Sequence, residues 1–138
     1  MATWKDVERI AAALPEAEQR GDERMWDVKG KHFAWERPLR PKEIVLWGEG
    51  APTDTPILAA MVPDLGAKEA LVADESGVYF TIPHFNGYRA VLVYLKKIGK
   101  RELEELLTEA WACRAPKRLA NEFLTSFRRS RDLGRRLG

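Results

Sequence analysis

The chain has 138 residues, of which 45% are hydrophobic and 32% are charged. This balance is typical of one soluble globular domain and excludes a fibrous or wholly disordered protein. A disulfide scaffold is excluded too, because Cys113 is the single cysteine. No apolar run approaches the roughly 20 residues of a membrane helix. The first residues lack the pattern of a signal peptide, so we expect a cytoplasmic protein.

The net charge of +2 is unevenly distributed along the chain. From Arg114 to the end there are eight basic and two acidic residues, a net charge of +6, which leaves −4 for the rest. A basic segment of this kind attracts phosphates or acidic partners, although a solvated, partly frayed tail has the same composition. We predict a single domain over residues 1–127 and a basic, flexible tail over residues 128–138.

The first third of the chain predicts a helix and a hairpin. Apolar residues recur at helical spacing over residues 4–13, after a good N-cap residue, Thr3. Two strands then flank a tight turn at Gly30, whose loop is either 29–30 or 30–31. Period-two alternation places four large apolar side chains on one buried sheet face, with Asp27 pointing away. These four are Trp26, Val28, Phe33 and Trp35.

The remaining segments predict a sheet with helices packed on it. We expect strands over residues 43–47, 57–62, 78–82 and 89–95, the last covered on both faces because both of its sides are apolar. A short helix opens at Asp64 or Gly66, another spans residues 101–113, and a last one starts at Pro116. The prediction is an α+β domain, with a curved, mainly antiparallel sheet, an N-terminal helix, one short inserted helix and two C-terminal helices.

Several segments of the chain carry a family resemblance. Residues 79–88 read Tyr-Phe-Thr-Ile-Pro-His-Phe-Asn-Gly-Tyr and lead into the apolar strand 90–95, while residues 28–34 form the Gly30 hairpin. The helical patterns at 102–107 and 110–116 agree with the same family. Together these segments resemble the MmcQ/YjbR family of small bacterial proteins, over about residues 3–124.

The resemblance implies a fold similar to frataxin, with a "double wing" likeness to DNA-binding proteins. It also implies DNA binding as the function, by likeness of shape and not by site chemistry. Iron binding does not follow from it. Frataxins carry an acidic ridge, whereas here Lys5 and Arg9 alternate with Asp6 and Glu8 on the first helix.

Two groups of basic residues are candidate phosphate contacts. One group lies at or after the first hairpin, which would act as a wing, and the other lies in the tail. No helix presents outward Asn, Gln and Arg side chains for reading bases, so we expect backbone contacts and little sequence specificity. The candidates are Lys29, Lys31, Arg37, Arg40 and Lys42 near the hairpin, and Arg128, Arg129 and Arg131 in the tail.

The loop around His84 offers an alternative function, that of an adaptor for a small molecule or a protein. Its aromatic and amide side chains could stack on and hydrogen-bond a planar ligand, provided that they line one concave site. A wide hairpin turning at Asn86-Gly87 explains the same loop without a ligand, and Trp111 fits the core as well. The candidate ligand-binding residues are His84, Asn86, Tyr88, Trp111 and Arg114.

No motif in the sequence supports catalysis or a metal site. The two histidines, His32 and His84, lack zinc-like spacing with each other and with Cys113. Neither a nucleophile elbow nor a phosphate-binding glycine loop is present. We therefore predict a non-enzymatic DNA-binding protein with no catalytic residue, metal or cofactor, and the sequence does not indicate its oligomeric state.

Overall fold

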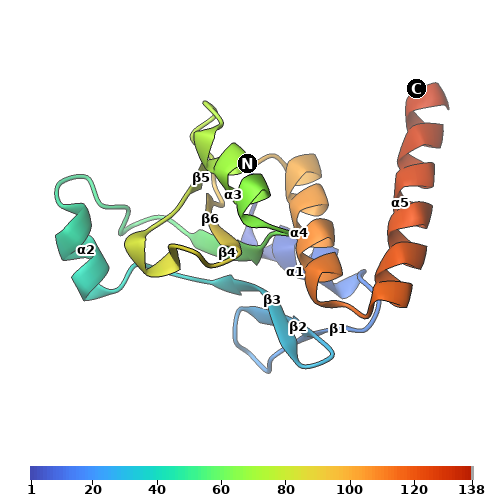
Figure 1. Cartoon of the computed structure of the whole chain (residues 1–138), viewed down its shortest axis with the longest axis horizontal. Helices are drawn as coiled ribbons and strands as arrows, with labels where there is room; N and C mark the ends of the chain where they lie inside the picture. The colour runs from blue at the N-terminus through green and yellow to red at the C-terminus, as the bar shows by residue number, and fades with distance from the viewer. Residues whose placement is uncertain (138) are drawn as a thin grey trace.

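The computed structural model describes residues 1–137 and contains one antiparallel sheet of six strands in the order β1-β2-β3-β4-β6-β5 (Figure 1). The strands are β1 (Ala17–Gln19), β2 (Met25–Val28), β3 (Lys31–Glu36), β4 (Ile57–Met61), β5 (Tyr79–Phe80) and β6 (Ala90–Tyr94). The helices are α1 (Trp4–Ala12), α2 (Pro41–Trp47), α3 (Leu65–Ala73), α4 (Lys100–Arg114) and α5 (Lys117–Leu137), with a short 3-10 turn, η1 (Pro83–Phe85). The α+β class is confirmed.

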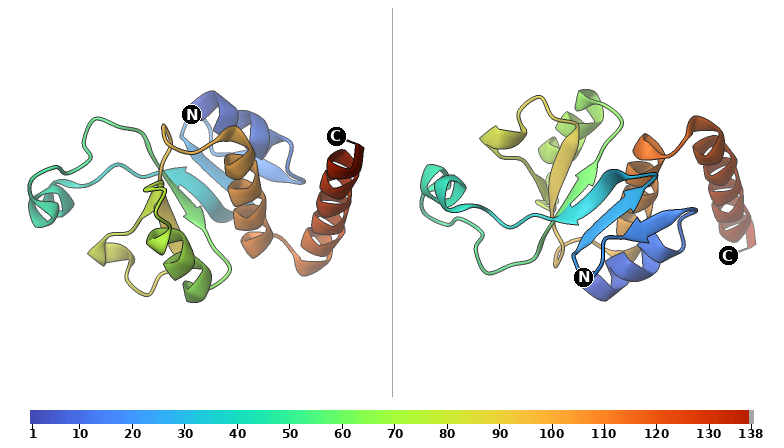
Figure 2. Two further views of the ribbon diagram at one scale, coloured as in Figure 1. Left: turned by 90° about the horizontal axis from the view of Figure 1, so that it is seen from above. Right: turned by 90° about the horizontal axis from the view of Figure 1, so that it is seen from below.

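The core lies around the paired central strands β4 and β6. Every residue of β4 and the first four residues of β6 are buried, which confirms that the strand predicted at 89–95 is covered on both faces. Helices α1 and α4 lie across one face, in front of the sheet when it is seen from above and behind it from below (Figure 2). On the other face, Phe80 of β5 stacks on Tyr94 of β6, with ring centroids 4.4 Å apart.

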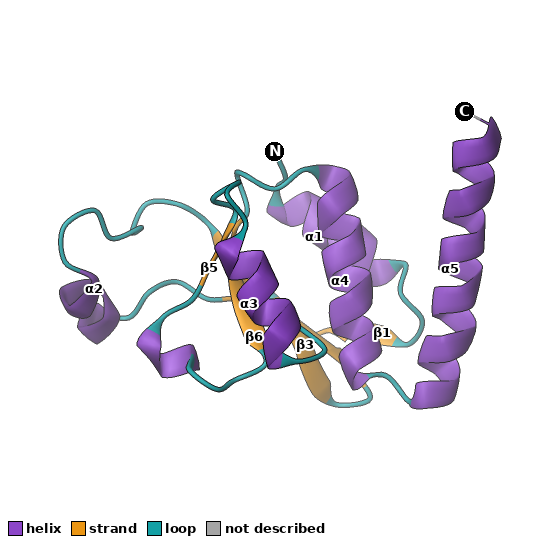
Figure 3. Ribbon diagram, turned by 45° about the horizontal axis from the view of Figure 1, so that its top comes forward, coloured by secondary structure: helices purple, strands orange, loops and turns teal. Residues whose placement is uncertain are grey.

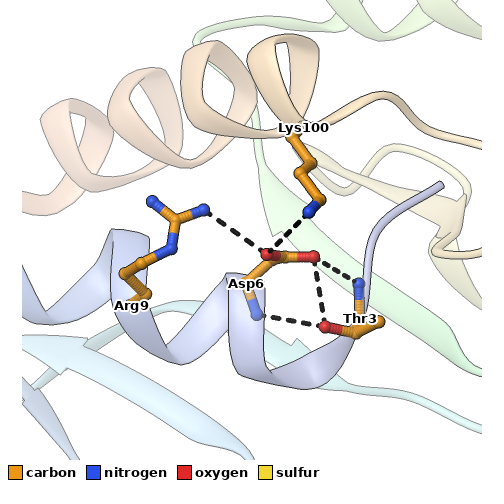
Figure 4. A network of polar contacts seen from close by, with 4 residues as sticks. All are labelled: Thr3, Asp6, Arg9 and Lys100. Atoms are coloured by element: carbon orange, nitrogen blue, oxygen red, sulfur yellow. Dashed lines mark hydrogen bonds and ion pairs between the residues drawn. The ribbon is translucent and has the colours of Figure 1, made fainter.

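A polar network at the start of α1 joins this helix to α4 (Figure 4). The Thr3 N–H donates to Asp6 Oδ2 over 2.9 Å, and the Asp6 N–H donates back to Thr3 Oγ1 over 3.3 Å. This reciprocal cap confirms Thr3 as the N-cap, and the Thr3 backbone donor lowers the pKa of Asp6. Lys100, the first residue of α4, places Nζ 3.9 Å from Asp6 Oδ1. The N-termini of the two helices therefore lie close together.

The first hairpin turns at Lys29-Gly30, one of the two predicted loops. Both residues have positive φ, 51° and 77°, as a two-residue type I′ turn requires. Three of the four apolar side chains predicted for one sheet face are fully buried or nearly so, since the relative exposure is 2% for Trp26 and 0% for Val28 and Phe33. Trp26 stacks on Trp4 of α1 with ring centroids 6.4 Å apart.

The prediction for Trp35 is wrong, because β3 contains a bulge. Trp26 pairs with Ala34 while Asp27 pairs with His32, so Phe33 is an extra residue that breaks the alternation. Trp35 consequently pairs with Met25, on the face opposite Trp26, and is only half-buried. Asp27 does point away from Trp26, and it is buried beside His32, whose Nδ1 lies 2.5 Å from Asp27 Oδ1.

One other expectation fails at the level of local structure, and another is confirmed. Residues 43–47 form the end of helix α2 and not a strand, because Pro41 starts a helix and Glu43 accepts from the Arg40 N–H at its beginning. The chain therefore has two short inserted helices where one was expected. The wide hairpin that explains the His84 loop without a ligand is present, because β5 pairs antiparallel with β6 and the loop between them contains η1. This loop turns at Asn86-Gly87, where the Tyr88 N–H donates to the Phe85 carbonyl over 3.0 Å. Helix α5 continues to Leu137 without a break at residue 127, and the division into domain and tail stays a prediction.

The opposite faces of Trp26 and Trp35 predict different costs for their truncation. Trp26→Ala should lower the free energy of unfolding by about 3–5 kcal/mol, as large core truncations do. Trp35→Ala should cost clearly less, because part of that side chain is already in water. Urea unfolding of both variants measures the difference. An equal loss in the two variants would contradict this assignment of faces.

Candidate functional site

The turn of the β2–β3 hairpin exposes two lysines. Lys29 Nζ lies 2.6 Å from Glu16 Oε1, but both side chains are about half exposed, at 53% and 51%. Ion pairs in this setting add little free energy, so a phosphate can compete with Glu16 for the ammonium group. Lys31, directly after the turn, is exposed. The tip thus offers two cationic groups to an anionic partner.

A hydrogen bond ties this hairpin to the end of α4. Arg114, the last residue of α4, donates from Nε to the His32 carbonyl over 3.0 Å. Helix α5 starts three residues later at Lys117, so its first turn lies beside the hairpin (Figure 3). Lys117 and Arg118 are both exposed there. We name this cationic region the hairpin–α5 surface; it consists of Lys29, Lys31, Lys117 and Arg118.

Helix α5 itself is strongly basic, with seven Lys or Arg residues and two acidic ones. Phe123 anchors it by packing edge-on against Trp111 of α4, with ring centroids 5.1 Å apart. Arg118 lies 3.5 Å from Glu122, but this pair is largely exposed and leaves the charge of Arg118 available to solvent. Among the tail candidates Arg129 is exposed, and the side chains of Arg128 and Arg131 lie outside the described residues.

The remaining basic candidates lie on a different part of the molecule. Arg40 and Lys42 belong to the start of α2, which projects from the sheet on the side away from α5 (Figure 1). Both are exposed. The structure therefore brings Lys29 and Lys31 together with the start of α5, and it keeps Arg40 and Lys42 apart from them.

Arg37 is not an exposed cation at all. Its guanidinium donates to both carboxylate oxygens of Glu43, over 2.9 and 2.7 Å, and to the Pro38 carbonyl over 2.7 Å. The side chains of Arg37 and Glu43 are only 8% and 10% exposed. The hydrogen bonds from Arg37 lower the pKa of Glu43. Three of its five N–H donors are used in this way and the side chain is buried, so Arg37 orients α2 and does not offer an exposed charge to a phosphate.

The five residues predicted to bind a ligand do not form one site. Trp111 is fully buried and donates from Nε1 to the Pro15 carbonyl over 2.9 Å, which confirms its interpretation as a core residue. Arg114 is engaged with the hairpin. Tyr88 is 41% exposed and packs edge-on against Phe85. His84 and Asn86 line two different hollows, one against α2 and one against α3.

A larger groove, of about 690 Å³, was not predicted from the sequence. It runs between α3 and α4 over Met61 and Tyr79, and Phe127 of α5 lies at its edge. Three carboxylates from α4 line it, namely Glu102, Glu105 and Glu109. Burial, together with the neighbouring Glu102, raises the pKa of Tyr79. The spacing of the three glutamates indicates one face of α4. The opposite wall of the groove comes from segments far away in the sequence, so the sequence alone does not predict the groove.

Comparison with known proteins now gives the family. A model described as YjbR matches residues 12–113. The chain belongs to the YjbR family. It is 51% identical over 129 residues to uncharacterized proteins of Mycobacterium bovis and Mycobacterium tuberculosis, covering 91% of this chain and 98% of each relative. No solved structure gives a significant match.

Within this YjbR-family protein, the family match contains the hairpin and the His84 loop but ends before α5.

Among the described residues, no three His, Cys, Asp or Glu side chains gather as a metal site would require, and no helix is long and apolar enough to cross a membrane. Partial burial of the Cys113 thiol raises its pKa to about 11, which is the opposite of what a nucleophilic cysteine needs.

The buried Arg37–Glu43 pair predicts a pH-dependent stability. The folded pKa of Glu43 lies below its unfolded value, so the pair contributes fully above about pH 4.3, the usual pKa of a glutamate, and is lost as the pH falls through the folded pKa. Glu43→Gln should lower the free energy of unfolding at neutral pH by about 3 kcal/mol, because it leaves the Arg37 charge uncompensated. The difference in the free energy of unfolding between wild type and Glu43→Gln should become smaller in acid.

Urea unfolding of both proteins at neutral pH and below pH 4 measures how this difference in the free energy of unfolding changes with pH. Glu49→Gln, at an exposed position, is the matched control and should behave like the wild type at every pH. A difference between wild type and Glu43→Gln that stays constant with pH would contradict the role given to the ion pair.

Proposed function

We propose that this protein binds nucleic acid through the phosphate backbone, with the hairpin–α5 surface as the contact. The observation that supports the proposal is the hydrogen bond from Arg114 to the His32 carbonyl. It holds the hairpin tip beside the first turn of α5, so that cations from two distant segments lie in one region. The carboxylates paired there, Glu16 and Glu122, are both exposed and hold their partners weakly.

Lysine and arginine side chains on a hairpin tip and a helix suit phosphates better than base edges. Ammonium groups on flexible stems neutralise backbone charge and carry no sequence information by themselves. The further arginines of α5, Arg128, Arg129 and Arg131, would extend the contact along the helix. The proposed activity is therefore non-catalytic and nearly independent of sequence.

The test is a salt titration of DNA binding by the full chain. The triple variant Lys31→Ala/Lys117→Ala/Arg118→Ala should bind duplex DNA more weakly, and its slope of log affinity against log salt should be shallower by about 2–3, because each lost phosphate contact removes about 0.9. Fluorescence anisotropy with two unrelated labelled duplexes measures both quantities. The loss should be the same for the two sequences. A second variant, with Arg128, Arg129 and Arg131 changed to Gln, tests the contribution of the tail in the same way.

A matched control removes three exposed cations near the opposite end of α4. Lys5, Lys96 and Arg101 are all exposed, and changing them to Ala should leave the salt slope unchanged. If the wild-type chain does not bind duplex DNA even at low salt, the proposal is wrong. Equal losses in the control and in the hairpin–α5 variant would show attraction by net charge without a defined surface.

A further inference from the structure

A hollow of about 610 Å³ lies between α2 and η1, away from the hairpin–α5 surface. Two kinds of side chain line it. Arg40, Lys42 and His84 bring polar or charged groups, and Pro41, Leu46 and Pro83 bring apolar surface. The two walls are some 40 residues apart in the sequence. The hollow therefore exists only because the fold brings α2 against η1.

The wall formed by α2 is fixed by a buried cation. Arg37 bonds both oxygens of Glu43, and its guanidinium carbon lies 5.5 Å from the ring centroid of Phe85, the last residue of η1. One residue thus contacts both walls. Glu43 also accepts from the Arg40 N–H over 2.8 Å, which sets the start of the helix.

The wall formed by η1 is fixed by a second buried cation. Lys68 of α3 donates from Nζ to the Phe85 carbonyl over 2.5 Å and to the Tyr88 carbonyl over 2.8 Å. Only 7% of Lys68 is exposed, and burial lowers its pKa. Burying a charged group has a high free-energy cost. Two such groups, Arg37 and Lys68, both hold the segments that enclose this hollow.

The charge that remains in the hollow is positive. Glu43 is the one carboxylate among the lining residues, and Arg37 already compensates it. Arg40 and Lys42 are exposed and have no ion pair with another described residue. The two positive charges beside the hollow match a dianion better than the single charge of a carboxylate or a phosphodiester. The imidazole of His84 adds a hydrogen-bond donor.

We propose that the hollow between α2 and η1 binds a small organic phosphate monoester. Arg40, Lys42 and His84 hold the phosphate, and the organic group packs on Pro41, Leu46 and Pro83. This site goes beyond the proposed nucleic-acid contact, because it uses different residues and recognises a terminal phosphate in place of a diester backbone. It also gives the predicted His84 site a ligand class and new partner residues.

Titration of the full chain with phenyl phosphate tests the proposal. Binding is measured by calorimetry and by the amide chemical shifts in NMR spectra. We expect saturable binding, with shifts concentrated at α2 and η1. Inorganic phosphate should bind roughly tenfold more weakly, because it lacks the apolar group, and methyl phenyl phosphate should bind roughly tenfold more weakly, because it carries one charge. Weak binding of all three with no localised shifts would overturn the proposal.

Variants separate this site from the nucleic-acid surface. Arg40→Gln/Lys42→Gln removes two exposed charges without disturbing the Arg37–Glu43 pair, and it should lower the affinity for phenyl phosphate at least roughly tenfold. It should leave DNA binding unchanged. Lys31→Ala/Lys117→Ala is the matched control and should leave phenyl phosphate binding unchanged. If the control loses as much affinity as the Arg40/Lys42 variant, the binding is non-specific and the site assignment is wrong, whatever the outcome with DNA.

Discussion

The central strands β4 and β6 are apolar on both faces, and the rest of the molecule is arranged to cover them. Helices α1 and α4 cover one face (Figure 2). The other face is partly covered by the long excursion between β3 and β4, in which Trp47 of α2 packs edge-on against Phe80, with ring centroids 5.6 Å apart. The projecting segment that carries α2 thus contributes to the cover of this second face. The hollow beside α2 is a consequence of that cover.

The elements whose pattern is local could be predicted from the sequence. Residues 57–62 were recognisable as a strand because Pro56 and Pro63 leave too few residues for a typical helix, and the hairpin loop followed from the need for positive φ at Gly30. The face of Trp35 could not be predicted, because a bulge at Phe33 shifts the alternation by one residue and leaves no compositional mark. The sequence predicts a strand where α2 forms, because the stability of this helix depends on the tertiary contact between Glu43 and Arg37.

The residues of the candidate sites could likewise be predicted from the sequence only in part. Of the five cations predicted near the hairpin, the sequence named four that lie at the surface, and their contact with phosphate stays a prediction; these four are Lys29, Lys31, Arg40 and Lys42. It could not distinguish Arg37 from them, because a buried arginine and an exposed one have the same side chain and differ only in their partners. Nor could it pair His84 with Arg40 and Lys42, since nothing in the spacing indicates that η1 lies against α2.

The two cationic regions are far enough apart to act independently. Lys31 starts β3 and Arg40 follows its end, and a six-residue strand spans about 17–20 Å. The Debye length at physiological salt is about 8 Å, so exposed charges at one end of β3 are largely screened from those at the other. The buried sheet lies between them, and the last residue of α4, Arg114, bonds to the hairpin. Occupation of one region should therefore leave the affinity of the other nearly unchanged, and substitutions in the two regions should have additive effects.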